Sequence, residues 1–206
     1  VGTRQYWDPQ LEGLSDQFRC IALDAPGYDG QPSDPLTPTE IGTRIIEFFD
    51  ALEVPVADLV GLSLGAMHAL YALSVAPERI GRVVLADTSL AFGADPIEWL
   101  AEWLAPVDQG GSPVELAAEA IDAIVADPLT DDVRSSLVNA FGRVTEAALR
   151  QAAATIAHHD ATAIASSVSN PCLVVCGEHD EETPLPYAEA LTETLPQGEL
   201  AVIRGA

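Results

Sequence analysis

Five short runs of apolar residues recur along the 206-residue chain, and each is bounded by residues that favour turns. Their shortness and apolar character predict buried strands at Cys20–Leu23, Leu59–Gly61, Val83–Ala86, Leu173–Cys176 and Leu200–Ile203. Segments with the apolar spacing of helices lie between them, at Thr39–Leu52, Leu64–Ala76 and Pro186–Leu195. Because strands alternate with helices, we predict an α/β fold, with a mostly parallel sheet and helices on both faces.

The alternation stops between Phe92 and Ser169, where helix follows helix with no strand pattern between them. The predicted helices of this stretch are Pro96–Leu104, Pro113–Ala126, Asp131–Ala140 and Thr145–Ile156. A helical block between two strands of one sheet is typical of an inserted cap. We therefore predict a discontinuous core of residues 1–92 and 169–206, with a helical cap at residues 93–168.

The charge of the chain is strongly one-sided, because 32 acidic residues face 9 basic ones and give a formal net charge of −23. All of the basic residues are arginine. Such a negative field repels phosphate backbones and anionic lipids, so neither nucleic acid nor a membrane is expected as a partner. No apolar run reaches the roughly 18 residues that a membrane span needs. We expect a cytoplasmic protein that acts on a small molecule.

The three cysteines predict neither a disulfide nor a zinc site. Cys172 and Cys176 lie in one predicted strand, where a rise of about 3.3 Å per residue separates their Cα atoms by roughly 13 Å. No pair has the spacing of a zinc finger, and no other motif implies a metal or an organic cofactor. We expect these thiols and Cys20 to be buried apolar groups in a reducing compartment.

The sharpest chemical signal is the pentapeptide Gly61-Leu62-Ser63-Leu64-Gly65, which follows a predicted strand and precedes a predicted helix. This context predicts a nucleophile elbow, a tight turn that holds a serine in a strained backbone conformation. Side chains two residues before and after the serine would collide, which explains glycine at both positions. The N-terminus of the following helix and the free N–H of Leu64 would stabilise an oxyanion.

A second signal is Asp180, which comes shortly after the predicted strand Leu173–Cys176. The carboxyl ends of parallel strands are where open α/β sheets keep their sites. Asp180 also follows Ser63 in the chain order of a Ser-Asp-His triad, in which it would orient a histidine. Asp87, at the end of another predicted strand, is the alternative acid.

A serine nucleophile needs a base within hydrogen-bond reach, and none of the four histidines is well placed for that role. His68 lies about one and a half helical turns beyond Ser63 and is expected to be a packing residue. His179 adjoins the candidate acid. His158 and His159 fall in the predicted cap, where a polar surface position is favoured over a role in the pocket.

Several segments together resemble the α/β-hydrolase superfamily, in particular the 3-oxoadipate enol-lactonases and related small carboxylesterases. These segments are Tyr6–Gln10, Leu23–Gly30, Gly61–Gly65, Ala76–Ile80 with Val83–Asp87, and Gly177–Pro184. They come from both halves of the predicted core, whereas the predicted cap resembles the family only in its length and helical character.

The resemblance implies that Ser63 is the nucleophile and Asp180 the acid of a catalytic triad. It also implies that the catalytic histidine belongs to a Gly-His pair about two residues beyond Ala206. The chain ends in a predicted strand that enters a small-residue turn, the kind of place where a loop histidine would follow. One oxyanion donor would be the N–H of Leu64. The other would come from a His-Gly-type loop at or just before Val1.

These observations predict a cofactor-free serine hydrolase that cleaves a small carboxylic ester or lactone through an acyl-enzyme on Ser63. An enol-lactone would need a carboxylate-binding pocket, for which Arg134, Arg143 and Arg150 are candidates, although surface charge is the simpler role for each. A perhydrolase or C–C bond hydrolase would use the same triad. The alternative from another class is a non-catalytic binding protein of this fold, and the presence of Ser63 with Asp180 argues against it.

Overall fold

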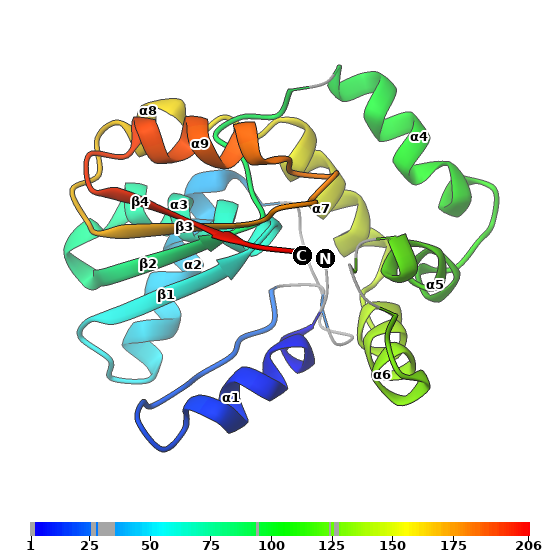
Figure 1. Ribbon diagram of the computed structural model, residues 1–206, viewed down its shortest axis with the longest axis horizontal. Coiled ribbons are helices and arrows are strands. Elements are labelled where there is room, and N and C mark those ends of the chain that lie inside the picture. The colour runs from blue at the N-terminus through cyan, green and yellow to red at the C-terminus, as the bar shows by residue number, and fades with distance from the viewer. Residues whose placement is uncertain (1–2, 26–27, 29–35, 94, 124, 126–127) are drawn as a thin grey trace. The chain divides into compact units, whose positions relative to one another are not determined.

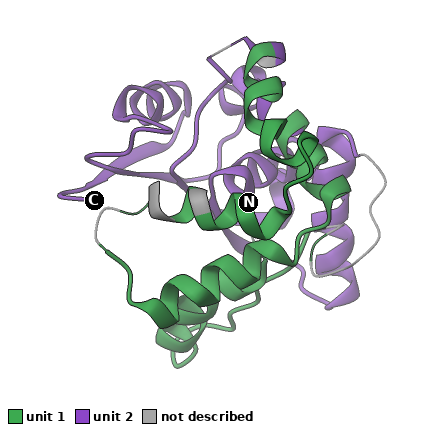
Figure 2. Cartoon of the chain, turned by 90° about the vertical axis from the view of Figure 1, so that its right-hand side faces the viewer, with its two compact units in different colours: residues 1–35, 98–154 green, residues 36–97, 155–206 purple. Residues whose placement is uncertain are grey.

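The computed structural model describes residues 3–25, 28, 36–93, 95–123, 125 and 128–206. The chain forms two compact units, coloured separately in Figure 2: unit 1 comprises residues 1–35 and 98–154, and unit 2 comprises residues 36–97 and 155–206. Each unit has a hydrophobic cluster of its own. The predicted division into a core (1–92 with 169–206) and a cap (93–168) follows chain topology rather than contacts, and it stays a prediction.

Unit 2 contains a four-stranded sheet in the order β1-β2-β3-β4, with every neighbouring pair parallel (Figure 1). Its strands are β1 (Ala57–Leu62), β2 (Ile80–Ala86), β3 (Cys172–Gly177) and β4 (Gly198–Ile203). Each connection between successive strands contains at least one helix, as parallel pairing requires. The predicted parallel sheet with helices is confirmed, and four of the five predicted strands are present. The prediction of burial is wrong for β4, whose residues Leu200, Val202 and Ile203 are exposed.

The helices of unit 2 share one hydrophobic cluster with the strands. They are α2 (Pro38–Ala51), α3 (Leu64–Val75), α8 (Thr162–Ala165) and α9 (Leu185–Thr194), with a short 3₁₀ turn η2 (Pro77–Arg79). Leu70 and Leu73 of α3 and Leu191 of α9 are fully buried in this cluster, beside Leu85 of β2 and Val174 of β3. The sheet face that carries these strand residues is therefore the packed face of the unit.

The sequence gives α2 a well-defined start. Thr37 accepts a hydrogen bond from the N–H of Glu40, and the Glu40 carboxylate accepts one from the N–H of Thr37. This reciprocal capping box satisfies two of the backbone donors that a helix N-terminus leaves free. At the far end of the same helix, Phe49 is buried in the cluster of unit 2.

The described part of unit 1 is helical. Its hydrophobic cluster, which is separate from that of unit 2, includes Ala117, Ile121, Phe141 and Leu149. Its elements are η1 (Arg4–Trp7), α1 (Asp8–Leu14), α4 (Pro96–Asp108), α5 (Pro113–Ala123), α6 (Asp131–Gly142) and α7 (Glu146–Ala157); the ends of α4 and α7 extend into unit 2. The four helices predicted between residues 93 and 168 are thus present. In the part of the chain that the structure describes, no helix is long and apolar enough to cross a bilayer.

The predicted strand Cys20–Leu23 is wrong, because the structure gives these residues no regular secondary structure. An isolated apolar run becomes a strand only when a neighbour completes its hydrogen bonds, and within the described ranges no strand pairs with this segment. Ile21 and Leu23 are accordingly 44% and 41% exposed. The helix α1 was not predicted, although Pro9 in its first turn is a helix-start signal.

Candidate active site

Ser63 connects the end of β1 to the start of α3 in a strained turn. Its backbone has φ 51° and ψ −117°, a conformation that a non-glycine residue rarely adopts and that is typically kept at functional sites. Its N–H donates to the carbonyl of Ala86 at the end of β2, 2.8 Å away, which fixes the turn against the neighbouring strand. The Ser63 hydroxyl makes no hydrogen bond within the described residues. This geometry is that of the predicted elbow.

The glycines on either side of Ser63 differ in their steric roles. A Cβ at Gly61 would lie 2.4 Å from the carbonyl oxygen of Gly65 and 2.5 Å from the nitrogen of Ala66, so no side chain fits there. A Cβ at Gly65 would meet no atom of the described chain within 4 Å. The steric explanation offered for both glycines therefore holds for Gly61 and is wrong for Gly65.

The start of α3 provides an anion-stabilising group beside the serine. The Ser63 carbonyl accepts the N–H groups of Ala66 and Met67, at 2.9 and 3.2 Å, and so closes the first turn. The N–H of Leu64 belongs to the free donors of that turn, where the helix dipole favours negative charge. Leu64 thus lies where an oxyanion donor is expected, and this role stays a prediction. Val1, the position expected for the second donor, lies outside the described residues.

Asp180 lies in the loop that follows β3, and this loop binds its carboxylate tightly. Oδ1 accepts the N–H groups of Glu182 and Thr183, each at 2.8 Å, and Oδ2 accepts the Thr183 hydroxyl at 2.6 Å. These three donors fix the orientation of the side chain. Asp180 is half-buried.

Asp87 follows β2 directly and faces the same loop. It is another non-glycine residue with positive φ (43°), and its Oδ1 accepts the N–H of Gly177 at 3.3 Å. Burial, and next the negative charge of Asp180, raise the pKa of the Asp87 carboxyl above its usual range. In the register of the sheet, Ala86 pairs with both Leu62 and Val175, so the ends of β1, β2 and β3 lie side by side.

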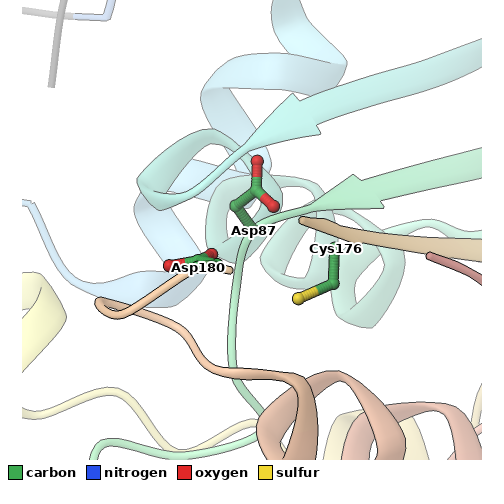
Figure 3. A group of neighbouring side chains, drawn as sticks. All are labelled: Asp87, Cys176 and Asp180. Carbon is green, nitrogen blue, oxygen red and sulfur yellow. The ribbon is translucent and has the colours of Figure 1, made fainter. Parts of the chain in front are cut away.

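Both candidate acids therefore meet at one sheet edge, together with a thiol. One oxygen of Asp87, one oxygen of Asp180 and the Cys176 sulfur all lie within 4.8 Å of one another (Figure 3). Oxygen and sulfur ligands could hold a metal ion, but burial and then the two carboxylates raise the pKa of the Cys176 thiol. The protonated thiol lies within hydrogen-bond distance of the carbonyls of Gly177 and Thr183, so it is a poor ligand.

A model of the alpha/beta hydrolase family matches residues 2–206, nearly the whole chain. The chain belongs to the α/β-hydrolase family. It is 24% identical over 212 residues to 3-oxoadipate enol-lactonase 2 of Acinetobacter baylyi, a match that covers 97% of this chain and 76% of that protein. Carboxylesterase YbfK of Bacillus subtilis is 36% identical over 103 residues, which cover 47% of this chain and 34% of the esterase.

Solved structures of other proteins superimpose on nearly the whole of this hydrolase. A hydrolase from Pseudomonas aeruginosa superimposes with a TM-score of 0.87 and 26% identity, covering 98% of this chain and 77% of that one. The enol-lactonase of Burkholderia xenovorans superimposes with a TM-score of 0.85 over 98% of this chain and 78% of its own; at 21% identity that likeness shows the fold alone.

The four histidines of this hydrolase differ in their exposure. His158 and His179 are exposed, and the main-chain N–H of His179 donates to the carbonyl of Ala206 at 2.6 Å. His68 is half-buried on α3, and burial lowers its pKa to about 4. His159 is 3% exposed, so a polar surface position was wrong for this residue. No histidine within the described residues is hydrogen-bonded to Ser63.

His159 is part of a buried polar network that the sequence did not reveal. Its Nδ1 lies 2.8 Å from the hydroxyl of Tyr71 on α3, and its Nε2 lies 3.0 Å from the carbonyl of Ser89. Because a carbonyl only accepts, Nε2 carries the proton and Nδ1 accepts from Tyr71. Burial also lowers the pKa of His159, which favours the neutral ring. The residue is structural and already satisfied.

The arginines considered as carboxylate ligands have partners of their own in unit 1. Arg150 forms ion pairs with Asp108 at 2.6 Å and Glu146 at 2.9 Å. Arg134 donates to the carbonyl of Ala118 at 2.8 Å. Arg143 also interacts with other groups. An acidic substrate would have to compete with these contacts, which weakens the prediction of an anionic lactone.

Proposed function

We propose that this α/β-hydrolase cleaves a small carboxylic ester or lactone by nucleophilic catalysis on Ser63, without a metal or organic cofactor. The observation that carries the proposal is the strained turn of Ser63, with its unengaged hydroxyl directly before the N-terminus of α3. The names of the enol-lactonase and carboxylesterase relatives support the choice of substrate class.

In the proposed reaction, the Ser63 oxygen attacks the substrate carbonyl while a base takes the hydroxyl proton. The carbonyl oxygen becomes an oxyanion that the N–H of Leu64 stabilises. The tetrahedral intermediate collapses, the C–O bond to the alcohol breaks, and the protonated base returns its proton to that leaving oxygen. Water then attacks the acyl-enzyme and releases the acid, restoring Ser63. In a lactone the alcohol stays attached to the product, which is a hydroxy acid.

The base of the proposed reaction is a histidine, and the loop of Asp180 is where its carboxylate partner lies. The carbonyl of Ala206 accepts the N–H of His179, and the N–H of Gly205 donates to the Glu178 carboxylate at 3.0 Å. The segment Gly205–Ala206 thus runs beside the loop of Asp180. A histidine held beside this loop would bridge Asp180 and Ser63.

A neutral substrate fits this protein better than an anionic one. The net charge of −23 repels anions, and the guanidinium of Arg150 is already paired with two carboxylates. We therefore expect uncharged esters and lactones to have the higher kcat/KM. A lactone that carries a free carboxylate should become a better substrate as ionic strength rises, because salt screens the repulsion.

The test uses the protein encoded by the complete gene, assayed on nitrophenyl esters and on a panel of simple lactones. Ser63→Ala is expected to lower kcat/KM at least about a thousandfold, because a triad acts as a unit. Ser74→Ala is the matched control on the same helix; its hydroxyl donates only to the Tyr71 carbonyl, and activity should be retained. A fluorophosphonate probe should label the wild type at Ser63.

The proposal would be refuted if the Ser63→Ala variant kept full activity and the probe failed to label Ser63 in the wild type. A wild-type protein that binds esters or lactones without turnover would instead support the non-catalytic binding protein.

A further inference from the structure

Asp87 occupies a constrained position against Gly177, the last residue of β3, which leads into the loop of Asp180. Its own N–H donates to the Val175 carbonyl of β3 at 2.9 Å, and its Oδ1 accepts the N–H of Gly177 at 3.3 Å. The positive φ of Asp87 is a conformation that aspartate adopts infrequently. Backbone and side chain together therefore connect the end of β2 to the start of the loop that carries Asp180.

The two carboxyl groups are close enough to affect each other. An oxygen of each lies within 4.8 Å of the other and of the Cys176 sulfur, in a half-buried place (Figure 3). Like charges at this separation oppose the ionisation of both groups. Burial, and next the negative charge of Asp180, raise the pKa of the Asp87 carboxyl.

The hydrogen bonds of the pair are unequal. Asp180 accepts two main-chain N–H groups and the Thr183 hydroxyl, whereas Asp87 accepts a single N–H at 3.3 Å. The loop therefore holds the Asp180 carboxylate firmly, whereas the Asp87 carboxylate is held by one longer hydrogen bond.

We propose that Asp87 is a positioning residue, whose carboxylate anchors the loop of Asp180 through Gly177 and adds a second negative charge behind the catalytic acid. This inference rests on the proposed function, because it concerns the same triad. When Asp87 is ionised, its charge stabilises the imidazolium that forms during the reaction. Removal of this charge should make the imidazolium less stable, which moves the acid limb of the pH profile to lower pH without lowering its plateau.

The groups that face Asp87 are few within the described residues. From β3 it is faced by the Cys176 thiol, and from the loop after β3 by Asp180. On α3 the titratable side chains are His68 and Tyr71, and Tyr71 is hydrogen-bonded to His159 rather than to an acid. The carboxylates next to Asp180 in the loop, those of Glu181 and Glu182, belong to exposed residues that water screens.

The experiment measures kcat/KM from pH 4.5 to pH 9 at constant ionic strength with the full-length enzyme and a neutral ester. Asp87→Asn keeps an acceptor for the Gly177 N–H and removes the charge. A charge in contact with a titrating group shifts its pKa by about 1–3 units, and a more distant charge shifts it by less. Because Asp87 lies behind the acid, its removal should lower the pKa of the catalytic histidine, and with it the acid limb, by about half a unit.

The Asp87→Ala variant loses both the charge and the hydrogen bond to Gly177. Its plateau kcat/KM should fall about tenfold, because small misplacements of catalytic groups are costly. The Asp87→Asn variant, which keeps an acceptor for the Gly177 N–H, should retain most of the plateau kcat/KM that Asp87→Ala loses.

Glu181→Gln is the matched control, since it removes an exposed negative charge from the same loop and should leave the profile unchanged. An acid limb of Asp87→Asn that coincides with the wild type overturns the inference. So does an Asp87→Asn variant that is inactive while Asp180→Asn is active, since Asp87 would then be the acid itself. Retained activity of Ser63→Ala refutes the proposed function separately.

A second measurement needs no variant. In carbon NMR of the wild type, Asp87 Cγ should titrate above the usual range of aspartate. Titration within that range would also overturn the inference.

Discussion

The buried network of Tyr71, His159 and Ser89 makes a quantitative prediction about stability. Tyr71→Phe removes one oxygen from a side chain that is 2% exposed and leaves the His159 Nδ1 without a donor. Leaving a buried acceptor unpaired costs about 1–3 kcal/mol of unfolding free energy. For a chain of this length, each kcal/mol corresponds to about 2–4 °C in the melting temperature.

The network contributes to stability at the place where the two chain segments that leave and re-enter unit 2 meet. The N–H of Phe92 donates to the His159 carbonyl, and the N–H of Ala161 donates to the Leu90 carbonyl, each at 2.8 Å. Ala91 and Asp160 form a β-bridge between the same segments. The His159 ring adds side-chain bonds to a junction that the main chain already forms.

The assay is urea unfolding followed by circular dichroism, with Tyr187→Phe as the control. Tyr187 is 37% exposed, and the loss of its hydroxyl should change the unfolding free energy by less than about 0.5 kcal/mol. In a His159→Leu background, Tyr71→Phe should cost much less, because the unpaired nitrogen is gone. A Tyr71→Phe protein as stable as the wild type, or an equal loss in both backgrounds, would refute the reasoning.

Two further predictions concern the elbow and the pH. Gly61→Ala should destabilise the protein by about 1–3 kcal/mol in urea unfolding, because its Cβ would clash with backbone, whereas Gly65→Ala should fold normally; equal effects would contradict the steric account. Burial lowers the folded pKa of His159 and of His68, the latter to about 4, while the unfolded value is about 6.5, so stability should be complete above pH 6.5 and decline as the pH falls toward 4. His159→Leu should flatten that decline, and an unchanged slope would argue against a neutral buried ring.

The sequence by itself determined what depends on local rules. Apolar runs between turn residues located the four paired strands, because short runs of this kind are typical of strands in a parallel sheet. The elbow around Ser63 was predictable because its steric demand acts between close neighbours in the chain, as the contact of Gly61 with Gly65 shows. The run Cys20–Leu23 has the same pattern but does not form a strand, since no local feature tells whether an extended segment will find a partner strand.

Only the tertiary structure decided how distant residues combine. Asp87 and Gly177 are 90 positions apart, and the register between β2 and β3 alone brings the two candidate acids together. Tyr71 and His159 are 88 positions apart, and burial at their meeting point makes a histidine with ordinary sequence neighbours structural. Such pairs are invisible in the sequence because parallel pairing joins strands through long crossovers, and the chemistry of each group is then set by desolvation and by partners that its neighbours in the chain do not supply.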